Sequence, residues 1–260
     1  MSIRFVSLLS SIILMSGCVS VKRVDETNMH PEELFESGSI DATEGGETRT
    51  YAYRLLRPVD PAGNGDKPLV VFLHGMGERG SNNVDQLDYL PTWMCEPSWR
   101  ERYQSFVLAV QCPGNELWVK SWDECGVPCS LIAVERVIEE LIENEDIDPS
   151  RVYLTGLSMG AYGSWALAAH RPDLFAGLVP ICGGGDPSTV EQLRGIPIWV
   201  FHGTSDTVVR ESESIEMVSA LRSAGITVGY TSLVGTGHDS WTDAYLREGA
   251  INWLFSQQRP

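Results

Sequence analysis

The stretch "LTGLSMGAYGSWALAAH", Leu154–His170, places Ser158 midway between two glycines. The apolar, β-branched residues before it, "RVYL", predict a strand, and the alanine-rich residues after it favour a helix. Ser158 therefore lies where a strand turns directly into a helix. Gly156 and Gly160 allow neighbouring backbone to pass this turn without a Cβ in the way.

The spacing of these residues is the G-x-S-x-G pattern, the nucleophile elbow, which holds a serine hydroxyl out at the edge of a sheet. An ordinary glycine-rich turn with an incidental serine has the same pattern. Five residues do not separate the two, so further motifs must decide.

Composition limits the classes of protein to consider. The chain has 260 residues, enough for one large α/β domain or two small ones. Its hydrophobic content of 43% is ordinary for a soluble globular protein. The formal net charge of -16 argues against nucleic acid as a partner, because phosphate binding needs a basic surface.

The N-terminus, "MSIRFVSLLSSIILMSGC", predicts export. Arg4 precedes an apolar run over residues 5–15, typical of a secretory signal and too short for a membrane-spanning helix. The end, "MSGC", resembles the lipobox of bacterial lipoproteins, with Met15 where leucine is more common. The resemblance implies cleavage before Cys18 and lipid attachment there. The alternative is a plain secreted protein whose signal happens to contain a cysteine.

Three segments follow: a lipoprotein signal peptide over residues 1–17, a lipid-anchored tether over 18–47 and a folded domain over 48–260. The tether is polar and acidic, with one short helix expected around Pro31–Phe35. Val19 follows the cysteine, and the lack of an aspartate there favours the outer membrane under enteric sorting rules.

Strand and helix patterns alternate from Thr48 to the end, which predicts a mostly parallel sheet with helices on both faces. Ligands of such sheets bind at the carboxyl ends of the strands. Strands are expected over 48–56, 68–75, 105–111, 151–156, 175–182, 196–203 and 227–234. Helices are expected over 130–145 (with Ser130 as N-cap), after the elbow to 170, and over 213–224 and 241–255.

Three further motifs follow predicted strands. "VVFLHGMGERG" places His74 at a strand end, "WVFHGTSDTVV" places Asp206 just past another, and "LVGTGHDSW" places His238 past the last. With Ser158, the order along the chain is serine, aspartate, histidine. This order on this kind of sheet is the α/β-hydrolase arrangement.

From Thr48 onward the chain resembles the serine esterases of the α/β-hydrolase fold. It is most similar to the dienelactone-hydrolase-like and phospholipase/carboxylesterase-like lineages, including polyhydroxybutyrate-depolymerase-type and feruloyl-esterase-type enzymes, through "HGMGERG", "GLSMGAYG", "HGTSDTVV" and "GHDSW". The resemblance implies hydrolysis of carboxylic esters through an acyl-enzyme intermediate, without cofactor or metal. Gly183–Gly195 is too short for a cap domain, which predicts an open site.

The expected catalytic residues divide the reaction between them. Ser158 attacks, His238 takes its proton, and Asp206 orients and stabilises the imidazole. Asp186, in "CGGGDP" one strand earlier, is the rival for the acid role, although the "HGTSD" context favours Asp206.

The oxyanion requires backbone donors. One is the N–H of Met159, directly after the nucleophile, and the resemblance assigns the other to Met76. Glu78 and Arg79 are expected to form an ion pair that braces this loop.

The irregular connection Cys112–Cys129 and the loop after His238 contain Trp118, Trp122 and Trp241. Each tryptophan could be a core residue, but together they predict an aromatic substrate wall suited to aryl or carbohydrate esters.

The cysteines of an exported chain can form disulfides. Cys112, Cys125, Cys129 and Cys182 are expected to converge on one rim and form one or two bridges, with Cys95 left over; unpaired buried thiols are the alternative. The "CGVPC" spacing has no second pair and no nearby histidine, which argues against zinc.

Two other functions stay open from the sequence. A serine peptidase of the prolyl-oligopeptidase type shares this catalytic domain, but the chain has no room for the propeller that usually accompanies it. A non-catalytic binding lipoprotein has no reason to keep all three catalytic residues.

Overall fold

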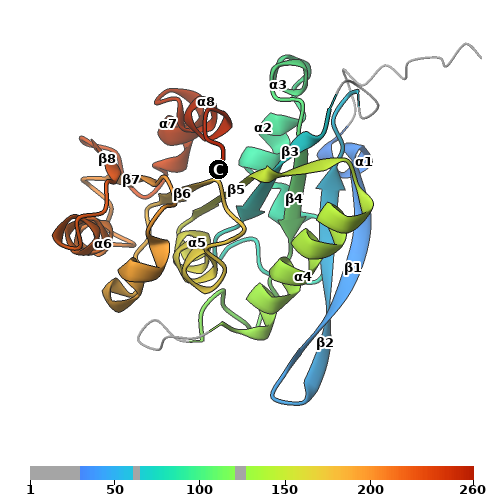
Figure 1. Ribbon diagram of the computed structural model, residues 1–260, viewed down its shortest axis with the longest axis horizontal. Coiled ribbons are helices and arrows are strands. Elements are labelled where there is room, and N and C mark those ends of the chain that lie inside the picture. The colour runs from blue at the N-terminus through green and yellow to red at the C-terminus, as the bar shows by residue number, and fades with distance from the viewer. Residues whose placement is uncertain (1–29, 61–64, 121–126) are drawn as a thin grey trace, which may run out of the picture.

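A single sheet organises the part of the chain that the computed structural model describes, residues 30–60, 65–120 and 127–260. Its strands follow the order β1-β2-β4-β3-β5-β6-β7-β8. Strand β2 pairs antiparallel with β1 and β4, and the pairs from β4 to β8 are parallel (Figure 1). The strands are β1 Phe35–Glu44, β2 Glu47–Leu56, β3 Lys67–Leu73, β4 Phe106–Val110, β5 Ile147–Leu157, β6 Gly177–Ile181, β7 Trp199–Gly203 and β8 Gly229–Leu233.

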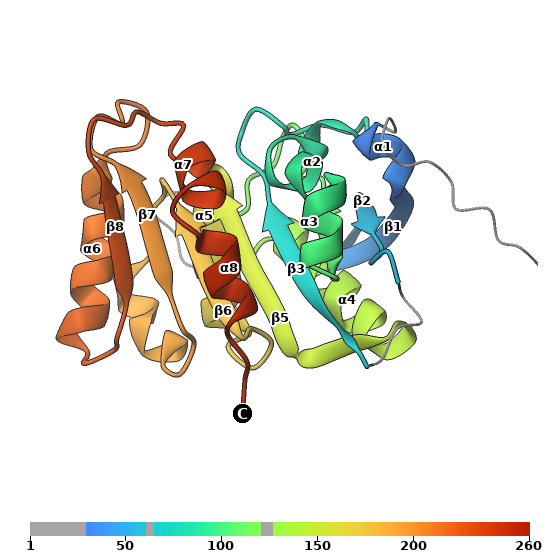
Figure 2. The ribbon, with the colours of Figure 1, turned by 90° about the horizontal axis from the view of Figure 1, so that it is seen from above.

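Helices cover both faces of the sheet, so the predicted α/β-hydrolase class is confirmed. Helices α4, α5 and α6 pack on one face and α2, α3, α7 and α8 on the other (Figure 2). The helices are α1 Pro31–Leu34, η2 Asp85–Leu87, α2 Leu90–Met94, α3 Pro97–Arg102, α4 Cys129–Asn144, α5 Met159–His170, η3 Pro187–Leu193, α6 Glu211–Ser223, α7 Trp241–Leu246 and α8 Ala250–Phe255.

Each face of the sheet has its own core. In β3, Leu69 and Val71 join one apolar cluster and Val70 and Phe72 join the other, and all four are fully buried. Burial on both sides explains why the parallel strands appear as continuous apolar runs in the sequence.

The predicted tether is wrong over its second half, because Phe35–Glu44 forms strand β1. It pairs with β2 in an antiparallel ribbon from Phe35↔Leu56 to Glu44↔Glu47. Ile40 and Ala42 are buried in the core on one face of the sheet and Phe35 in the core on the other. The remaining side chains of the strand are exposed or half-buried, so most of its sequence is polar and resembles a loop. The short helix near Pro31 is confirmed as α1.

Two helix boundaries also differ from expectation. Pro128 is the N-cap residue of α4, and Ser130 lies inside the helix, where its hydroxyl donates to the carbonyl of Leu117. The closing helix is two helices, α7 and α8, separated at Gly249, which has the left-handed conformation (φ 80°, ψ 20°).

Residues 1–29, 61–64 and 121–126 lie outside the described residues. The signal peptide, Cys18, Trp122 and Cys125 are therefore among the expectations that the structure does not describe. In the described ranges, no helix is long and apolar enough to cross a membrane.

A buried histidine anchors the loop that follows β3. The Nδ1–H of His74 donates to the carbonyl of Gly75 (2.6 Å), and Nε2 accepts from the N–H of Cys112 (2.9 Å). The Trp118 indole donates to the carbonyl of His74 (3.0 Å). These bonds require a neutral imidazole, and burial lowers the pKa of His74 to about 4.

This anchor should make stability depend on pH. Because the pKa falls from 6.5 to about 4 on folding, the unfolded chain binds the extra proton between these values. The contribution of neutral His74 to the free energy of unfolding is fully present above pH 6.5 and is lost as the pH falls towards 4. The loss amounts to roughly 3 kcal/mol.

We expect His74→Gln, which cannot titrate but can still accept from Cys112, to be less stable at neutral pH. Its free energy of unfolding should also fall less steeply between pH 6.5 and 4.5, because unfolding then takes up about one proton fewer. Urea denaturation across this range measures both; parallel curves for the two proteins would contradict the assignment.

Candidate active site

The elbow serine has a strained backbone. Ser158 connects β5 to α5 with φ 52° and ψ -119°, and its N–H donates to the carbonyl of Ile181 (2.9 Å). Both flanking glycines have ordinary φ, and close approach explains why they are needed. A Cβ on Gly160 would lie 1.9 Å from the carbonyl oxygen of Leu73, and one on Gly156 would lie 2.4 Å from that of Gly160.

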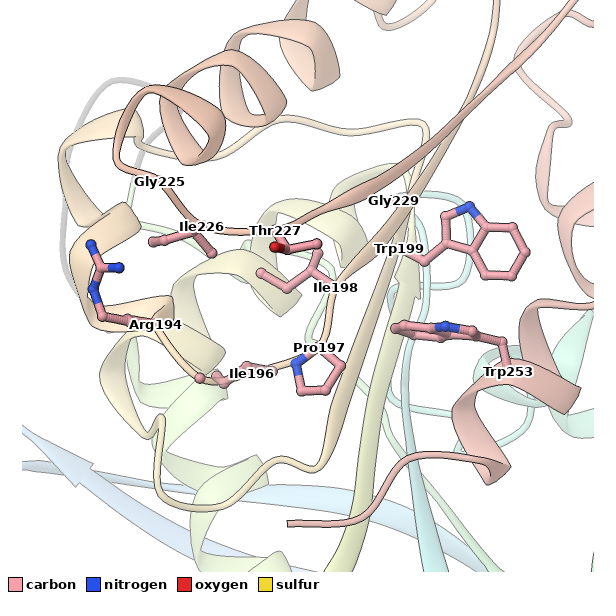
Figure 3. A pocket seen from close by; sticks show the side chains of 11 residues that line it. Arg194, Ile196, Pro197, Ile198, Trp199, Gly225, Ile226, Thr227, Gly229 and Trp253 are labelled. Carbon is pink, nitrogen blue, oxygen red and sulfur yellow. The ribbon is translucent and has the colours of Figure 1, made fainter. Parts of the chain in front are cut away.

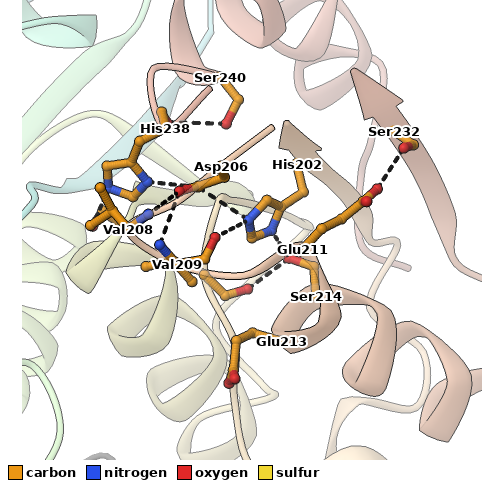
Figure 4. A network of polar contacts seen from close by, with 12 residues as sticks. His202, Asp206, Val208, Val209, Glu211, Glu213, Ser214, Ser232, His238 and Ser240 are labelled. Atoms are coloured by element: carbon orange, nitrogen blue, oxygen red, sulfur yellow. Dashed lines mark hydrogen bonds and ion pairs between the residues drawn. The ribbon is translucent and has the colours of Figure 1, made fainter. Parts of the chain in front are cut away.

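Three side chains from different strand ends form one hydrogen-bonded chain. His238 Nε2 lies 3.0 Å from Ser158 Oγ, and His238 Nδ1 lies 2.7 Å from Asp206 Oδ2. Since the carboxylate can only accept, Nδ1 carries the hydrogen and Nε2 is free to accept from the serine hydroxyl. The imidazole side chain is 21% exposed, whereas that of Asp206 is 0% exposed. Figure 4 shows the ring of His238 beside the carboxylate of Asp206.

The buried carboxylate of Asp206 remains ionised because of its donors. Burial alone would raise its pKa, but hydrogen bonds from His238 and from the N–H groups of Val209 (2.9 Å) and Val208 (2.8 Å) outweigh burial and lower it. The rival acid, Asp186, has another task. It is the N-cap residue of η3, where it accepts from the N–H of Ser188 (2.8 Å).

The two expected oxyanion donors belong to backbone beside Ser158. Met159 is the first residue of α5, so its N–H has no partner within the helix. Met76 lies in the loop after His74, and a Cβ on the preceding Gly75 would be 3.8 Å from the Cβ of Ser158.

The loop that contains Met76 is braced differently from the expected ion pair. Arg79 donates to the carbonyls of Met76 and Glu116 (both 3.1 Å) instead of to Glu78. The carboxyl group of Glu78 lies against Gly75, and burial raises its pKa.

The predicted aromatic wall is wrong for Trp118, which is 0% exposed and packs in the core against Gly163. Trp241 is 8% exposed, and its ring lies edge-on to that of His238 at 5.4 Å. Trp241 therefore packs against the expected base, His238, and little of its ring is exposed to form a substrate wall.

Two partly exposed aromatic residues near this site, Tyr89 and Trp93, are not among the residues predicted from the sequence. Tyr89 lies 5.2 Å from Trp241 and 6.4 Å from Trp93, measured between ring centroids. Tyr89 also has φ 65°, an unusual conformation for a residue with a bulky side chain. The only signal in the sequence was an aromatic pair one helical turn apart, in a segment with no recognisable motif.

The expected disulfides are wrong for Cys112, Cys129 and Cys182, which are buried thiols with no bridge among them. Burial raises the pKa of Cys112 and of Cys182 to about 12, so both stay protonated. The Cys182 sulfur lies within 4.8 Å of ligand atoms of Asp206 and His238. A metal there would need a thiolate and would have to replace the Asp206–His238 hydrogen bond.

An apolar pocket of about 650 Å³ lies at the opposite end of the strands (Figure 3). It is formed by the segments that lead into β7 and β8 and by Trp199 and Trp253. The three catalytic candidates follow the carboxyl ends of β5, β7 and β8, so this pocket is separate from their site.

The chain is similar to known esterases and polyester depolymerases. Poly(3-hydroxyalkanoate) depolymerase C of Paucimonas lemoignei is 47% identical over 122 residues, covering 45% of this chain and 28% of the relative. Poly(3-hydroxybutyrate) depolymerase of Ralstonia pickettii is 28% identical over 172 residues, 62% of this chain and 34% of the relative. The chain thus spans about a third of the length of these curated relatives.

The fold is also similar to that of a known esterase. The crystal structure of a thermostable esterase superposes with a TM-score of 0.82 at 38% identity, covering 87% of this chain and 64% of that one. The phospholipase/carboxylesterase family model matches residues 117–246, half of the 260 residues, including Ser158, Asp206 and His238. The chain therefore belongs to the phospholipase/carboxylesterase family of the α/β-hydrolase fold.

Proposed function

We propose that this protein hydrolyses carboxylic esters with Ser158 as the nucleophile. The observation that carries the proposal is the continuous chain of hydrogen bonds from Ser158 through His238 to Asp206. Family membership and the similarity to a thermostable esterase support the same reaction class.

The proposed reaction has two stages. Ser158 Oγ attacks the ester carbonyl carbon while its proton passes to His238 Nε2, and the alcohol then leaves with that proton. Water repeats the sequence on the acyl-enzyme and releases the acid. Asp206 stabilises the imidazolium, and the N–H groups of Met159 and Met76 would stabilise the oxyanion.

We propose that the substrate is an ester attached to a polymer or to an aryl or carbohydrate group. The segment from Cys182 to Ile198, where related folds insert a cap, contains only η3, so nothing from this segment roofs the catalytic edge. Two curated relatives are named as polyester depolymerases, which supports a large substrate. Tyr89 provides a partly exposed ring beside Trp241 for stacking.

Removing the nucleophile tests the reaction. Ser158→Ala should lower turnover of soluble esters on the order of 10³-fold or more and abolish labelling by a fluorophosphonate probe, with the fold intact. Asp206→Asn should be severe as well, because the wrong tautomer of His238 would be favoured.

Asp186→Asn is the matched control, since its carboxylate caps η3, and it should keep most of the turnover. A mild effect at Asp206 with a severe one at Asp186 would transfer the acid role. Peptide turnover without ester turnover would instead favour the peptidase, and no probe labelling of the wild type would favour a binding protein.

The proposed wall makes a separate prediction. Tyr89→Ala should raise KM for oligomeric and aryl esters roughly threefold to tenfold, with little change for methyl acetate, because only the larger substrates stack on the ring. Tyr89→Phe keeps the ring and should behave like the wild type. Equal effects of Tyr89→Ala on all esters would argue against a wall.

We also propose that the domain is held at the membrane by lipid on Cys18, through a tether that ends near α1. The motif "MSGC" and the preceding apolar run support this. Cys18→Ser should move the protein out of the membrane fraction or block its processing, as measured by fractionation and by the mass of the mature N-terminus. An unmodified, wholly soluble wild type would contradict the anchor.

A further inference from the structure

A second histidine contacts the catalytic acid. His202 lies in β7, four residues before Asp206, and its side chain is 0% exposed. Its Nε2 is 3.3 Å from Asp206 Oδ2 and 3.0 Å from the carbonyl oxygen of Val209, and its Nδ1 is 2.7 Å from Ser214 Oγ (Figure 4). In the sequence this residue showed only as a histidine before a turn glycine.

The hydrogen positions on His202 follow from its partners. Both neighbours of Nε2, the carboxylate and the Val209 carbonyl, can only accept, so Nε2 carries a hydrogen. An imidazole with no hydrogen on Nε2 would bring three acceptors together in a fully buried place, at a large free-energy cost. The Nε2–H of His202 therefore donates to the Val209 carbonyl, which keeps this N–H beside the carboxylate of Asp206.

Ser214 lets His202 exist in two protonation states without losing a hydrogen bond. Its hydroxyl lies 2.8 Å from the carbonyl oxygen of Gly183 as well as 2.7 Å from His202 Nδ1. When the imidazole is neutral, the hydroxyl can donate to Nδ1. When it is charged, Nδ1–H donates to Ser214 and the hydroxyl rotates to Gly183.

Donors thus surround the carboxylate of Asp206. Oδ1 accepts from the N–H groups of Val208 and Val209, and Oδ2 accepts from His238 Nδ1–H. His202 Nε2 lies 3.3 Å from Oδ2, and its hydrogen bond goes to the carbonyl of Val209 in the same turn. Two backbone donors and the His238 imidazole fix the rotation of the carboxylate, and His202 holds the turn that supplies the backbone donors through its bond to Val209.

We propose that His202 is a positioning residue for Asp206: it holds the turn from Asp206 to Val209 through the Val209 carbonyl and places an N–H 3.3 Å from Oδ2. This rests on the proposed function, in which Asp206 is the catalytic acid. The consequence is that the N–H dipole of His202 beside Oδ2 offsets part of the negative charge that Asp206 presents to His238.

Other ionisable groups surround this pair and must be counted in any pH effect. Glu211 and Glu213 belong to α6, next to Ser214; Glu211 bonds to Tyr230 of β8, and Glu213 to Tyr162 of α5. Around His202 and Asp206 the ionisable groups are His238, Glu211, Glu213, Tyr162, Tyr230 and Cys182. All of them remain in place in the variants below.

The test compares His202→Leu, which has no donor, with His202→Gln, whose amide nitrogen can reach the position of Nε2. For a soluble ester, His202→Leu should lower kcat roughly 10- to 100-fold with KM nearly unchanged. The acid limb of its kcat/KM profile should move to higher pH, because the carboxylate then favours the protonated form of His238. His202→Gln should restore most of kcat and return the acid limb towards that of the wild type.

Equal losses in both variants with an unmoved acid limb would overturn the proposal and leave His202 a packing residue. Wild-type activity in both variants would overturn it as well.

A second measurement needs neither turnover nor a variant that folds. The chain has five histidines, and 15N NMR of histidine-labelled wild-type protein reports which ring nitrogens carry hydrogen. Hydrogen on Nε2 of His202, slow to exchange with solvent, is the expected result; a bare Nε2 would overturn the proposal. If the wild type shows this signal but neither hydrolyses esters nor reacts with a fluorophosphonate, the proposed function fails while the His202–Asp206 contact stands.

Discussion

The contact between the start of α5 and the end of β3 is the constraint on which the site depends. The backbone at Gly160 lies so close to the carbonyl oxygen of Leu73 that no Cβ fits between them. This approach holds Ser158 in its strained conformation and brings the loop of Gly75 and Met76 beside it. His74 and Trp118 then anchor that loop through hydrogen bonds that are buried away from water.

A second constraint on the site is that Asp206 must keep its negative charge although its side chain is buried. Burying a carboxylate away from water costs free energy unless its oxygens accept hydrogen bonds. Asp206 meets this condition with two backbone donors from its own turn and the Nδ1–H of His238 from the loop after β8. His202 of β7 bonds to the carbonyl of Val209 in that turn. The same donors that stabilise the charge also set its direction, so burial and orientation are achieved together.

The two ends of the strands have different characters. The carboxyl ends gather the polar groups of the catalytic candidates, and the amino ends of β7 and β8 carry an apolar pocket beside Trp199 and Trp253. A polar site at the carboxyl ends is what parallel topology favours, because loops there can converge without disturbing the sheet. The superposition with the thermostable esterase covers 87% of this chain, so the similarity extends over the sheet and is not confined to the elbow.

Local patterns were enough to predict much of this protein. The alternation of apolar runs and helical spacing predicted a mostly parallel sheet with helices on both faces, and the glycine spacing around Ser158 predicted the elbow. Both patterns depend on neighbours along the chain. Asp206 and His238 could be placed beside Ser158 from sequence alone, since the ends of parallel strands meet at one edge.

What only the tertiary structure decided depends on partners distant in sequence. Strand β1 exists because β2 pairs with it, which its polar outer face concealed. Trp118 is core and Tyr89 is partly exposed because burial is a property of the packed layers, not of the residue type. His202 is held by Ser214 of α6, whose hydroxyl also contacts the carbonyl of Gly183 after β6. No spacing in the sequence predicts these contacts, because they depend on how distant elements pack.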